Sequence, residues 1–316
     1  MNALKDDKRV AGYMSRLVLG DVQQFQNMMV VPLFTSINHG PDYLTLKEAL
    51  EKALVSVVEV SLGGSVPELK VINQAELPVL LVDGEELAGA RQNRVLNSSV
   101  LLREKSETVV PVSCSEQGRW SYRSRHFSHS GHIMAHKLRN LKSSTVAESL
   151  KKSQGYTSDQ GAIWGHVQML ASHAGVQSPT HAMQDVFTAK MKDLDSYLDA
   201  FQPLPEQRGL LVLINGEIAG LDIVSLDRAY RFLHPTLVKS YALDALLELD
   251  GAAQSWPPLW DIDKATAFFK AASECKETKY PSIGYGQDYR FESRKVAGSA
   301  LVADDKVIHM ALYRLG

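Results

Sequence analysis

The chain has 316 residues, of which 45% are hydrophobic and 22% charged. This is the composition of an ordinary globular protein and excludes the disordered and fibrous classes. The 34 basic and 36 acidic residues give a net charge of −2, which argues against broad electrostatic capture of duplex nucleic acid. The longest apolar runs, such as 77–82 and 209–214, have the length of strands and are too short for a membrane span.

The amino terminus and the cysteine content point to one compartment. The first ten residues, MNALKDDKRV, mix acidic and basic groups where a secretory signal would place a cationic segment and an apolar run. The two cysteines, Cys114 and Cys275, supply neither a disulfide framework nor a paired-cysteine zinc motif. We therefore expect a cytoplasmic protein.

The amino-terminal part of the chain has mainly strand patterns. After an arm over residues 1–20 without clear periodicity, Asn27–Phe34 predicts a buried strand in which Pro32 favours an edge position or a bulge. Thr45 and Glu48 have the spacing of a capping box, so a short helix is expected after them.

Val57–Leu62 predicts a strand that closes this amino-terminal unit. The apolar residues at 58, 60 and 62 alternate with Glu59 and Ser61. Because successive side chains of a strand point to opposite faces, we expect the carboxylate and the hydroxyl on the polar face.

The central block consists of strands with short connections. Leu77–Val82 is apolar and ends in Asp83-Gly84, a pair preferred in two-residue hairpins, so a returning strand is expected from Leu87. Val95–Leu102 and Thr108–Cys114 predict two further strands. These connections are too short for crossover helices, which indicates an antiparallel sheet.

The pattern becomes helical over residues 131–204 and mixed over 205–316. Ser178-Pro179 predicts the start of a helix, Pro235 the start of another, and Lys264–Cys275 a third. Strands are expected at Gly209–Val224, Arg290–Glu292, Gly298–Ala303 and Val307–Tyr313, with Asp304-Asp305 as the last turn.

These patterns predict an α+β fold with largely antiparallel sheets at both ends of the chain and a helical middle segment. We expect one integrated domain over 21–316, which is β-rich over 21–125. The sequence VDGEELAG at 82–89 resembles INGEIAG at 214–220. Either two hairpins have selected similar turn residues, or a β-rich half has been duplicated.

The first candidate site segment follows the Asp83-Gly84 turn. Glu85 and Glu86 have carboxylates suited to a general base, a metal ligand or an acceptor for ribose hydroxyls, and one of the two at most is expected to face a site. Gln92, Asn93 and Arg94 combine amides with a guanidinium that could hold a phosphate or a carboxylate. The structural alternative is a surface strand with ion pairs.

The second candidate segment ends the strand at Cys114. A nearby guanidinium would lower the pKa of this thiol and make it a nucleophile, whereas free cysteines are also common as small buried residues. Glu116, Gln117, Arg119 and Trp120 follow. Arg119 suits an anion and Trp120 suits stacking on a flat ring; the alternative is an ion pair beside a partly buried tryptophan.

Other polar stretches are less specific. The four histidines at 126, 129, 132 and 136 have helix-like spacing but no acidic residue among them, so we expect a solvated loop leading into a helix at Ile133 and no metal site. Ser158–Trp164 predicts a capped helix start, where free amides favour anions. In the glycine-rich Gly284–Arg290 loop, we expect Asp288 and Arg290 to pair.

Six of these motifs together resemble one protein family. They are DGEELAGARQNRVLN, VPVSCSEQGRW, SDQGAIW, SPT, KSYALDAL and GYGQDYR. The chain, from about Asn27 to its end, is similar to an uncharacterised prokaryotic family named for its association with ADP-ribosylglycohydrolases and rhodanese-phosphatase proteins. The family pattern falls on Glu85, Glu86, Gln92, Asn93, Arg94, Cys114, Glu116, Gln117, Arg119 and Trp120, and the histidine run is not part of it.

The resemblance implies a role in NAD or ADP-ribose metabolism and a functional link to ADP-ribosylglycohydrolase, and it brings no established activity or cofactor. Two hypotheses follow. In the first, an enzyme acts on a nucleotide-derived phosphate or ADP-ribosyl group, with Glu85, Glu116 or Cys114 in the chemistry. In the second, a non-catalytic protein binds such a ligand through Arg94, Arg119 and Trp120, or serves as a protein-interaction module.

Overall fold

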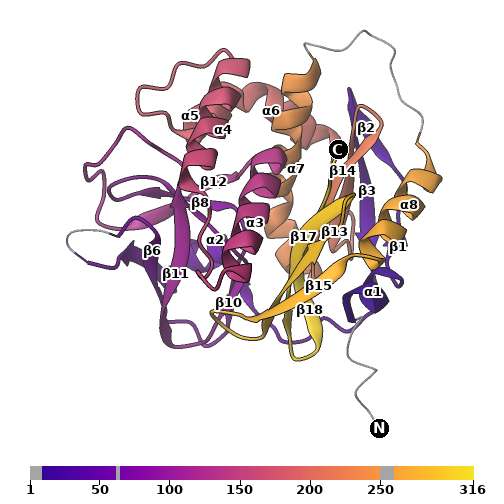
Figure 1. Ribbon diagram of the computed structural model, residues 1–316, viewed down its shortest axis with the longest axis horizontal. Coiled ribbons are helices and arrows are strands. Elements are labelled where there is room, and N and C mark those ends of the chain that lie inside the picture. The colour runs from indigo at the N-terminus through magenta and orange to yellow at the C-terminus, as the bar shows by residue number, and fades with distance from the viewer. Residues whose placement is uncertain (1–8, 62–64, 250–259) are drawn as a thin grey trace.

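The computed structural model describes residues 9–61, 65–249 and 260–316. These residues form 8 helices and 18 strands, with strands towards both ends of the chain and helices in the middle (Figure 1). All strand pairs but one are antiparallel, the exception being β4 with β7. The α+β fold expected from the sequence is therefore confirmed. No helix in the described ranges is long and apolar enough to cross a membrane.

The elements of the first half are α1 (Arg9–Met14), β1 (Val18–Leu19), β2 (Gln23–Phe25), β3 (Met28–Phe34), β4 (Leu44–Thr45), α2 (Leu46–Glu51), β5 (Val55–Glu59), β6 (Glu68–Asn73), β7 (Val79–Leu81), β8 (Glu85–Gly89), β9 (Arg94–Leu96), β10 (Val100–Leu102), β11 (Ser106–Cys114) and β12 (Phe127–Ile133). Those of the second half are α3 (His136–Lys151), α4 (Gln160–His173), α5 (Met183–Ala189), α6 (Met191–Ala200), β13 (Gly209–Ile214), β14 (Glu217–Val224), α7 (Asp227–Leu249), α8 (Ile262–Ser273), β15 (Lys276–Pro281), β16 (Gln287–Glu292), β17 (Val296–Ala303) and β18 (Lys306–Arg314).

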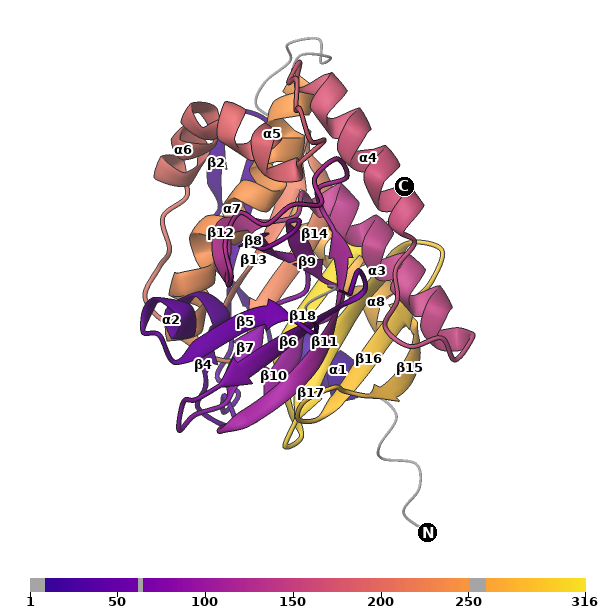
Figure 2. The same cartoon turned by 90° about the vertical axis from the view of Figure 1, so that its left-hand side faces the viewer.

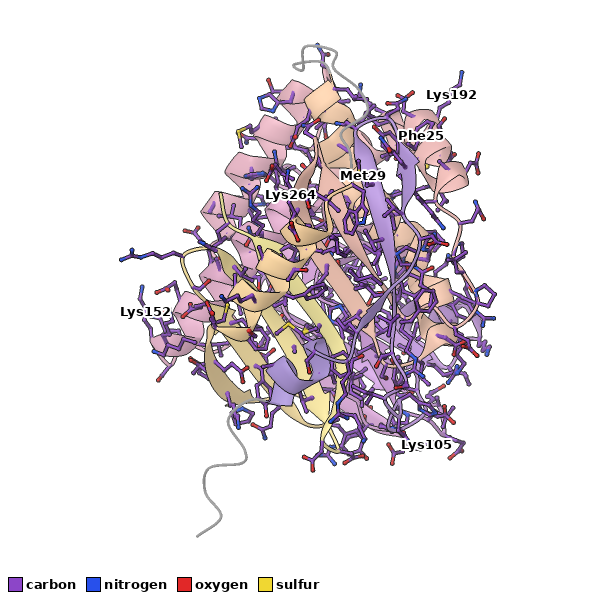
Figure 3. All side chains as sticks on the ribbon, turned by 90° about the vertical axis from the view of Figure 1, so that its right-hand side faces the viewer. Phe25, Met29, Lys105, Lys152, Lys192 and Lys264 are labelled. Atoms are coloured by element: carbon purple, nitrogen blue, oxygen red, sulfur yellow. The ribbon has the colours of Figure 1, made fainter. Side chains whose placement is uncertain are left out.

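A nine-stranded sheet joins the two ends of the chain. Its order is β1-β3-β13-β14-β18-β17-β16-β15, and β2 also pairs with β3. One face, which carries Met29 and Leu211, packs against α1 and α8 (Figure 3). The other face, which carries Val30 and Val212, packs towards α7 and the remaining helices (Figure 1). Alternate residues of β3 and β13 thus serve two separate cores.

A six-stranded sheet, in the order β12-β8-β9-β11-β6-β5, carries both candidate site segments. Its two end strands, β5 and β12, contact each other, so the sheet curls around an apolar core that includes Val57, Val110 and Phe127 (Figure 2). A three-stranded sheet, β10-β7-β4, closes this core and supplies residues such as Val79 and Leu81.

Helix α3 lies between the two large sheets and is tied to both by buried ion pairs (Figure 1). Arg139 donates to Asp222 of β14 through Nη1 at 3.1 Å and Nη2 at 2.6 Å. Lys142, one turn later, donates to Asp83 and to the Leu96 carbonyl. All four charged side chains are fully buried. Burial raises the pKa of Asp222, but the charge of Arg139 and hydrogen bonds outweigh burial and lower this pKa to about 2.

The buried strand expected at Asn27–Phe34 is confirmed as β3, and the position of Pro32 has a clear reason. β3 lies inside the sheet, but its outer neighbour is split into β1 and β2. The Pro32 carbonyl accepts from the Gly20 amide in this gap, at 2.8 Å. Since the N–H and C=O of one strand residue face the same side, the N–H that proline lacks would point into the same gap.

The prediction of a hairpin at Asp83-Gly84 is wrong, and so is the prediction of a single strand over Val95–Leu102. β7 and β8 flank the turn but belong to different sheets, and residues 95–102 form β9 and β10, also in different sheets. The chain changes sheets twice here because Asp83 is held inside by Lys142 and by its backbone bond to Ser99. Asn215-Gly216, by contrast, is a true hairpin turn with both φ angles positive. The proposed duplication stays a prediction.

Three further boundaries differ from expectation. α5 begins at Met183 instead of Pro179, because the Ser178 side chain closes a turn by accepting from the Ala182 amide at 2.8 Å. Pro235 lies inside α7 and does not begin it. The strand expected at Val57–Leu62 is β5, two residues earlier, and Leu62 lies outside the described residues.

The faces of β5 are also opposite to those expected. Val55 and Val57 are the buried residues, so Glu59 continues the inward face and Val58 lies on the other. The cap at Thr45 is confirmed, since its hydroxyl accepts from the Glu48 amide at 3.2 Å. The Asp304-Asp305 turn between β17 and β18 is confirmed as well, and β15 was not anticipated.

Replacement of Asp222 by asparagine tests the weight of the ion pair on α3. Arg139 would be left buried without a counter-charge, so the free energy of unfolding should fall by about 3–5 kcal/mol. Urea denaturation measures the free energy of unfolding. Asp227→Asn is the matched control, because Asp227 pairs with Arg231 at the surface and should contribute less than about 1 kcal/mol. Equal losses in the two variants would contradict the assignment.

Candidate functional site

Strand pairing brings the two candidate segments together. β9 and β11 are antiparallel neighbours, and Arg94 lies directly opposite Cys114. The residues that precede β9 and those that follow β11 therefore lie together at one edge of the sheet, where β9 begins and β11 ends. The segment before α5 closes over them, because the amides of Gln117 and Gly118 donate to the Thr180 carbonyl at 3.2 and 2.8 Å.

Arg119 is the most highly bonded side chain of this edge. Its Nε donates to Glu116 at 2.9 and 3.0 Å, and its Nη2 donates to Glu116 at 2.7 Å and to Asn93 Oδ1 at 3.2 Å. Its Nη1 donates to the carbonyls of Ala90 and Ser121 at 2.7 and 2.9 Å. Every guanidinium nitrogen is thus used within the protein, and Arg119 has no donor left for an anion.

Glu116 is fixed as an ionised acceptor by the same bonds. Besides Arg119, it accepts from the Asn93 amide at 3.1 Å. Burial raises the pKa of Glu116, but hydrogen bonds from Arg119, Thr180 and Asn93 outweigh burial and lower this pKa below its ordinary value. A carboxylate held in this way suits a positioning role better than proton transfer.

The bend after β8 is held in a strained conformation by these groups. Ala90 is fully buried and has a φ of +38°, a region that costs energy for residues with a Cβ. Its carbonyl accepts from Arg119 and from the Arg123 amide, and its amide donates to Ser124 Oγ at 3.1 Å. The bend therefore couples Arg119 to the segment that begins at Tyr122.

Arg94 is equally buried but far less satisfied. Its Nη1 donates to Gln92 Oε1 at 3.1 Å and to the Asn93 carbonyl at 3.4 Å. Within the described part of the chain, its Nε and Nη2 atoms have no hydrogen-bond partner although they are buried. The guanidinium lies 5.7 Å from the centroid of the Trp120 ring. A buried guanidinium with unused donors suits the binding of a group that accepts hydrogen bonds.

Glu59 of β5 is a further charged residue near Arg94 that the sequence analysis did not select as a site residue. Its charge acts on both Arg94 and the Cys114 thiol. Both carboxylate oxygens are buried, and neither has a hydrogen-bond partner among the described residues. The alternation of side chains along β5 could have identified Glu59. Once Val57 is assigned to the core, Glu59 must face the same side.

A groove of about 980 Å³ lies over this region. It is lined by Val58, Glu59, Val60, Ser61, Tyr122, Arg123, Ser124, Arg125 and His126. Tyr122 of this lining is 51% exposed, and Trp120, two residues before it in the chain, is 46% exposed. The Arg91 guanidinium lies 5.4 Å from the centroid of the Trp120 ring and 4.6 Å from that of the Tyr122 ring. Exposed rings stacked with arginine form a surface suited to flat, anionic ligands.

Cys114 is fully buried, and its backbone is bound at both polar atoms by the Gln160 side chain, at 2.7 and 2.9 Å. Burial raises the pKa of the thiol above its ordinary value, although Arg94 acts in the opposite direction. The thiol is therefore protonated at neutral pH, which removes the property that a nucleophile would need.

Glu85 and Glu86 face opposite sides of β8, as expected for adjacent strand residues. Glu85 accepts from the Val82 amide at 2.6 Å, and His129 Nε2 lies 3.2 Å from its other oxygen. Glu86 accepts from Ser115 Oγ at 2.6 Å. Burial raises the pKa of Glu86 to about 7, against the lowering effect of hydrogen bonds from Ser115 and Ser130.

The amide residues of the two segments link them. Gln92 Nε2 donates to the Gln117 carbonyl at 3.2 Å, and Asn93 Nδ2 donates to Gln184 at 2.9 Å. The exposed side chain of Gln117 accepts from Gln168 of α4 at 2.8 Å. These amides hold strand, loop and helices together around the charged groups.

The four histidines have different surroundings. The expected solvated loop is wrong, because His129 and His132 lie in β12. His132 stacks on Phe187 with centroids 4.5 Å apart, His136 Nδ1 lies 2.6 Å from Asp244, and His126 lines the groove. In the ranges that the structure describes, no three His, Cys, Asp or Glu side chains are grouped so as to hold a metal ion.

The two weaker motifs also have definite places. Asp159 caps α4 by accepting from the Ala162 amide at 2.9 Å, so the capped helix start is confirmed. Asp288 and Arg290 pair as expected, at 2.6 and 3.0 Å, but they are buried in β16. Neither Asp159 nor the Asp288–Arg290 pair lines the groove described above.

The chain belongs to the family described as ARG and Rhodanese-Phosphatase-superfamily-associated Protein domain, whose model matches residues 16–313. The resemblance carried by the central motifs is thereby confirmed. The description implies an association with ADP-ribosylglycohydrolase and rhodanese-phosphatase proteins. No curated protein and no solved structure matches the chain.

Replacement of the two arginines by methionine should separate their roles. Arg119→Met leaves Glu116 buried without its cation, so the free energy of unfolding should fall by about 3–5 kcal/mol. Arg94→Met removes a guanidinium in which two nitrogens are buried without a partner among the described residues, and this gain should offset the lost bonds to Gln92 and the Asn93 carbonyl to within about 1 kcal/mol. Chemical denaturation of both variants measures this difference. A large loss in Arg94→Met would mean that its unused donors are satisfied in solution by the protein itself.

The raised pKa of Glu86 predicts a pH-dependent stability. The folded carboxyl binds a proton up to about pH 7, whereas an unfolded glutamate loses its proton near pH 4.5. The contribution of Glu86 to stability is therefore fully present below about pH 4.5 and is lost as the pH rises to 7, by about 3 kcal/mol.

Glu86→Gln should flatten this part of the stability profile and be more stable than the wild type at pH 8. Thermal unfolding between pH 4.5 and 8 measures this stability profile in both proteins. Glu107→Gln, at an exposed residue of β11, is the control and should leave the profile unchanged. Parallel profiles for wild type and Glu86→Gln would rule out a titration of Glu86 in this range.

Proposed function

We propose that this protein binds a phosphate-bearing, nucleotide-derived ligand of the ADP-ribose type in the cytoplasm. The observation that carries the proposal is Arg94, a buried guanidinium with unused donors on which the charge of the groove-lining Glu59 acts. The family description, with its association with ADP-ribosylglycohydrolase, supports the same class of ligand and a functional link to that enzyme.

The roles within the site follow from the hydrogen bonds. Arg94 holds a phosphate oxygen, and Arg123 and Arg125 on the groove lining add positive charge at the approach to it. Trp120, which is half exposed, stacks on the base. Gln92, Asn93, Gln117 and Arg119 position these groups, because their own polar atoms are engaged within the protein.

Binding without turnover is the form of the proposal that the side chains favour. Of the three candidate catalytic groups, Glu85 and Glu116 have their oxygens engaged in the fold, and the Cys114 thiol is protonated. Turnover of the bound group is the second candidate. Glu86 favours it, because a carboxyl with a pKa of about 7 is suited to proton transfer near neutral pH.

Titration with ADP-ribose tests the binding proposal. At a hundred times Kd, the ligand should stabilise the protein by about 2.7 kcal/mol, which appears as a rise in the unfolding midpoint. Arg94→Met should abolish this rise. Arg103→Met is the matched control, because Arg103 also stacks on an aromatic ring, 4.2 Å from Tyr285, outside the groove. A rise that survives Arg94→Met would contradict the proposed site.

Incubation with NAD, ADP-ribose and ADP-ribosylated protein separates the two candidates. Product that forms with the wild type and is lost in Glu86→Gln, while ADP-ribose still binds, supports turnover. Product lost instead in Glu116→Gln together with binding supports a positioning role for Glu116. Absence of product alongside a thermal shift supports the binding protein.

A further inference from the structure

Glu59, which lines the groove, and Arg94, on which its charge acts, both have buried polar atoms that the fold leaves unused. Arg94 offers Nε and Nη2 as donors, and Glu59 offers two carboxylate oxygens as acceptors; none of these atoms has a partner among the described residues. Each side chain lies within the electrostatic reach of the other. Glu59 is also one of the residues that line the groove.

A phosphate alone does not account for both groups. Phosphate oxygens accept hydrogen bonds from a guanidinium, but they repel a carboxylate at the same distance. A ligand that satisfies Glu59 must donate hydrogen bonds, and two neighbouring donors match the two oxygens of one carboxylate. The hydroxyls of a sugar have this property, since each hydroxyl can donate to Glu59 and accept from Arg94.

We propose that Glu59 recognises the vicinal hydroxyls of a ribose, so that the groove selects ribose-bearing ligands over those that lack this diol. This inference rests on the proposed function, because it assigns the sugar of the same ligand. Glu59 is then a specificity residue that contacts the ligand, while Arg94 holds the adjoining phosphate. In this arrangement the Glu59 carboxylate contacts the neutral sugar, and Arg94 contacts the anionic phosphate.

The direction in which Glu59→Gln changes ligand affinity separates recognition of the diol from a simple balancing of the charge of Arg94. Glu59→Gln removes a negative charge beside Arg94, so electrostatics alone predicts tighter binding of every anionic ligand. Recognition of the diol predicts the opposite for a ribose ligand, because a charge-assisted pair of hydrogen bonds is lost. A ligand without the diol should show only the electrostatic gain.

Isothermal titration of the full chain with ADP, 2′,3′-dideoxy-ADP and pyrophosphate provides the test. The wild type should bind ADP about ten- to a hundredfold more tightly than dideoxy-ADP. In Glu59→Gln, this preference should fall to about one, while pyrophosphate binds as well as before or better. Glu107→Gln, a paired surface glutamate of β11, should leave all three affinities unchanged. Thermal unfolding of each variant checks that it is folded.

The outcomes distinguish the two proposals. If ADP and dideoxy-ADP bind the wild type equally, the Glu59 assignment is overturned while the binding function stands. If Glu59→Gln tightens ADP as much as pyrophosphate, Glu59 only balances the charge of Arg94. A preference for GDP over ADP that Glu59→Gln abolishes would give the carboxylate to a base edge and overturn the ribose assignment. If no nucleotide binds at all, the proposed function falls, and this inference falls with it.

Discussion

The burial of two ion pairs on α3 is the constraint on which the rest of the structure depends. Arg139 reaches β14 of the nine-stranded sheet, and Lys142 reaches the turn before β8 of the six-stranded sheet. Buried charges are costly to desolvate and tolerate little change in geometry, so they fix the helix with respect to both sheets more strictly than apolar contacts would. Lys142 thereby ties α3 to Asp83, in the turn that leads into β8.

The two arginines of the candidate site differ in how completely the fold satisfies their hydrogen-bond donors. Both Arg94 and Arg119 are buried in the six-stranded sheet or its edge, yet one uses every nitrogen within the fold and the other leaves two unused. A chain selected only for stability would not retain an unsatisfied guanidinium, because each unpaired buried donor costs free energy. This cost is expected where a ligand supplies the missing acceptors.

Local patterns predicted much of the fold, and non-local contacts account for the errors. Apolar and β-branched runs and turn residues were sufficient for β3, β11 and the Asp304-Asp305 turn, whose conformations depend on neighbouring residues. The Asp83-Gly84 turn was misassigned because its aspartate pairs with Lys142, which is remote in sequence. In the candidate site, polar clustering in the sequence selected 92–94 and 114–120, and the pairing of β9 with β11 brings these segments together. This clustering could not show which arginine was satisfied, and Glu59 escaped notice because the phase of β5 was set by a core not visible locally.

The position of the exposed rings follows from the same arrangement. Arg119 anchors the chain at the buried edge and holds the strained bend at Ala90, and the Ala90 carbonyl in turn accepts from the amide of Arg123. Trp120 and Tyr122 leave this anchored backbone at alternate positions and remain exposed beside the groove. A ligand that stacks on them gains from a surface already fixed by the fold, so little conformational entropy is lost on binding. Under the proposed function, the strained bend at Ala90 is therefore part of what preorganises the groove.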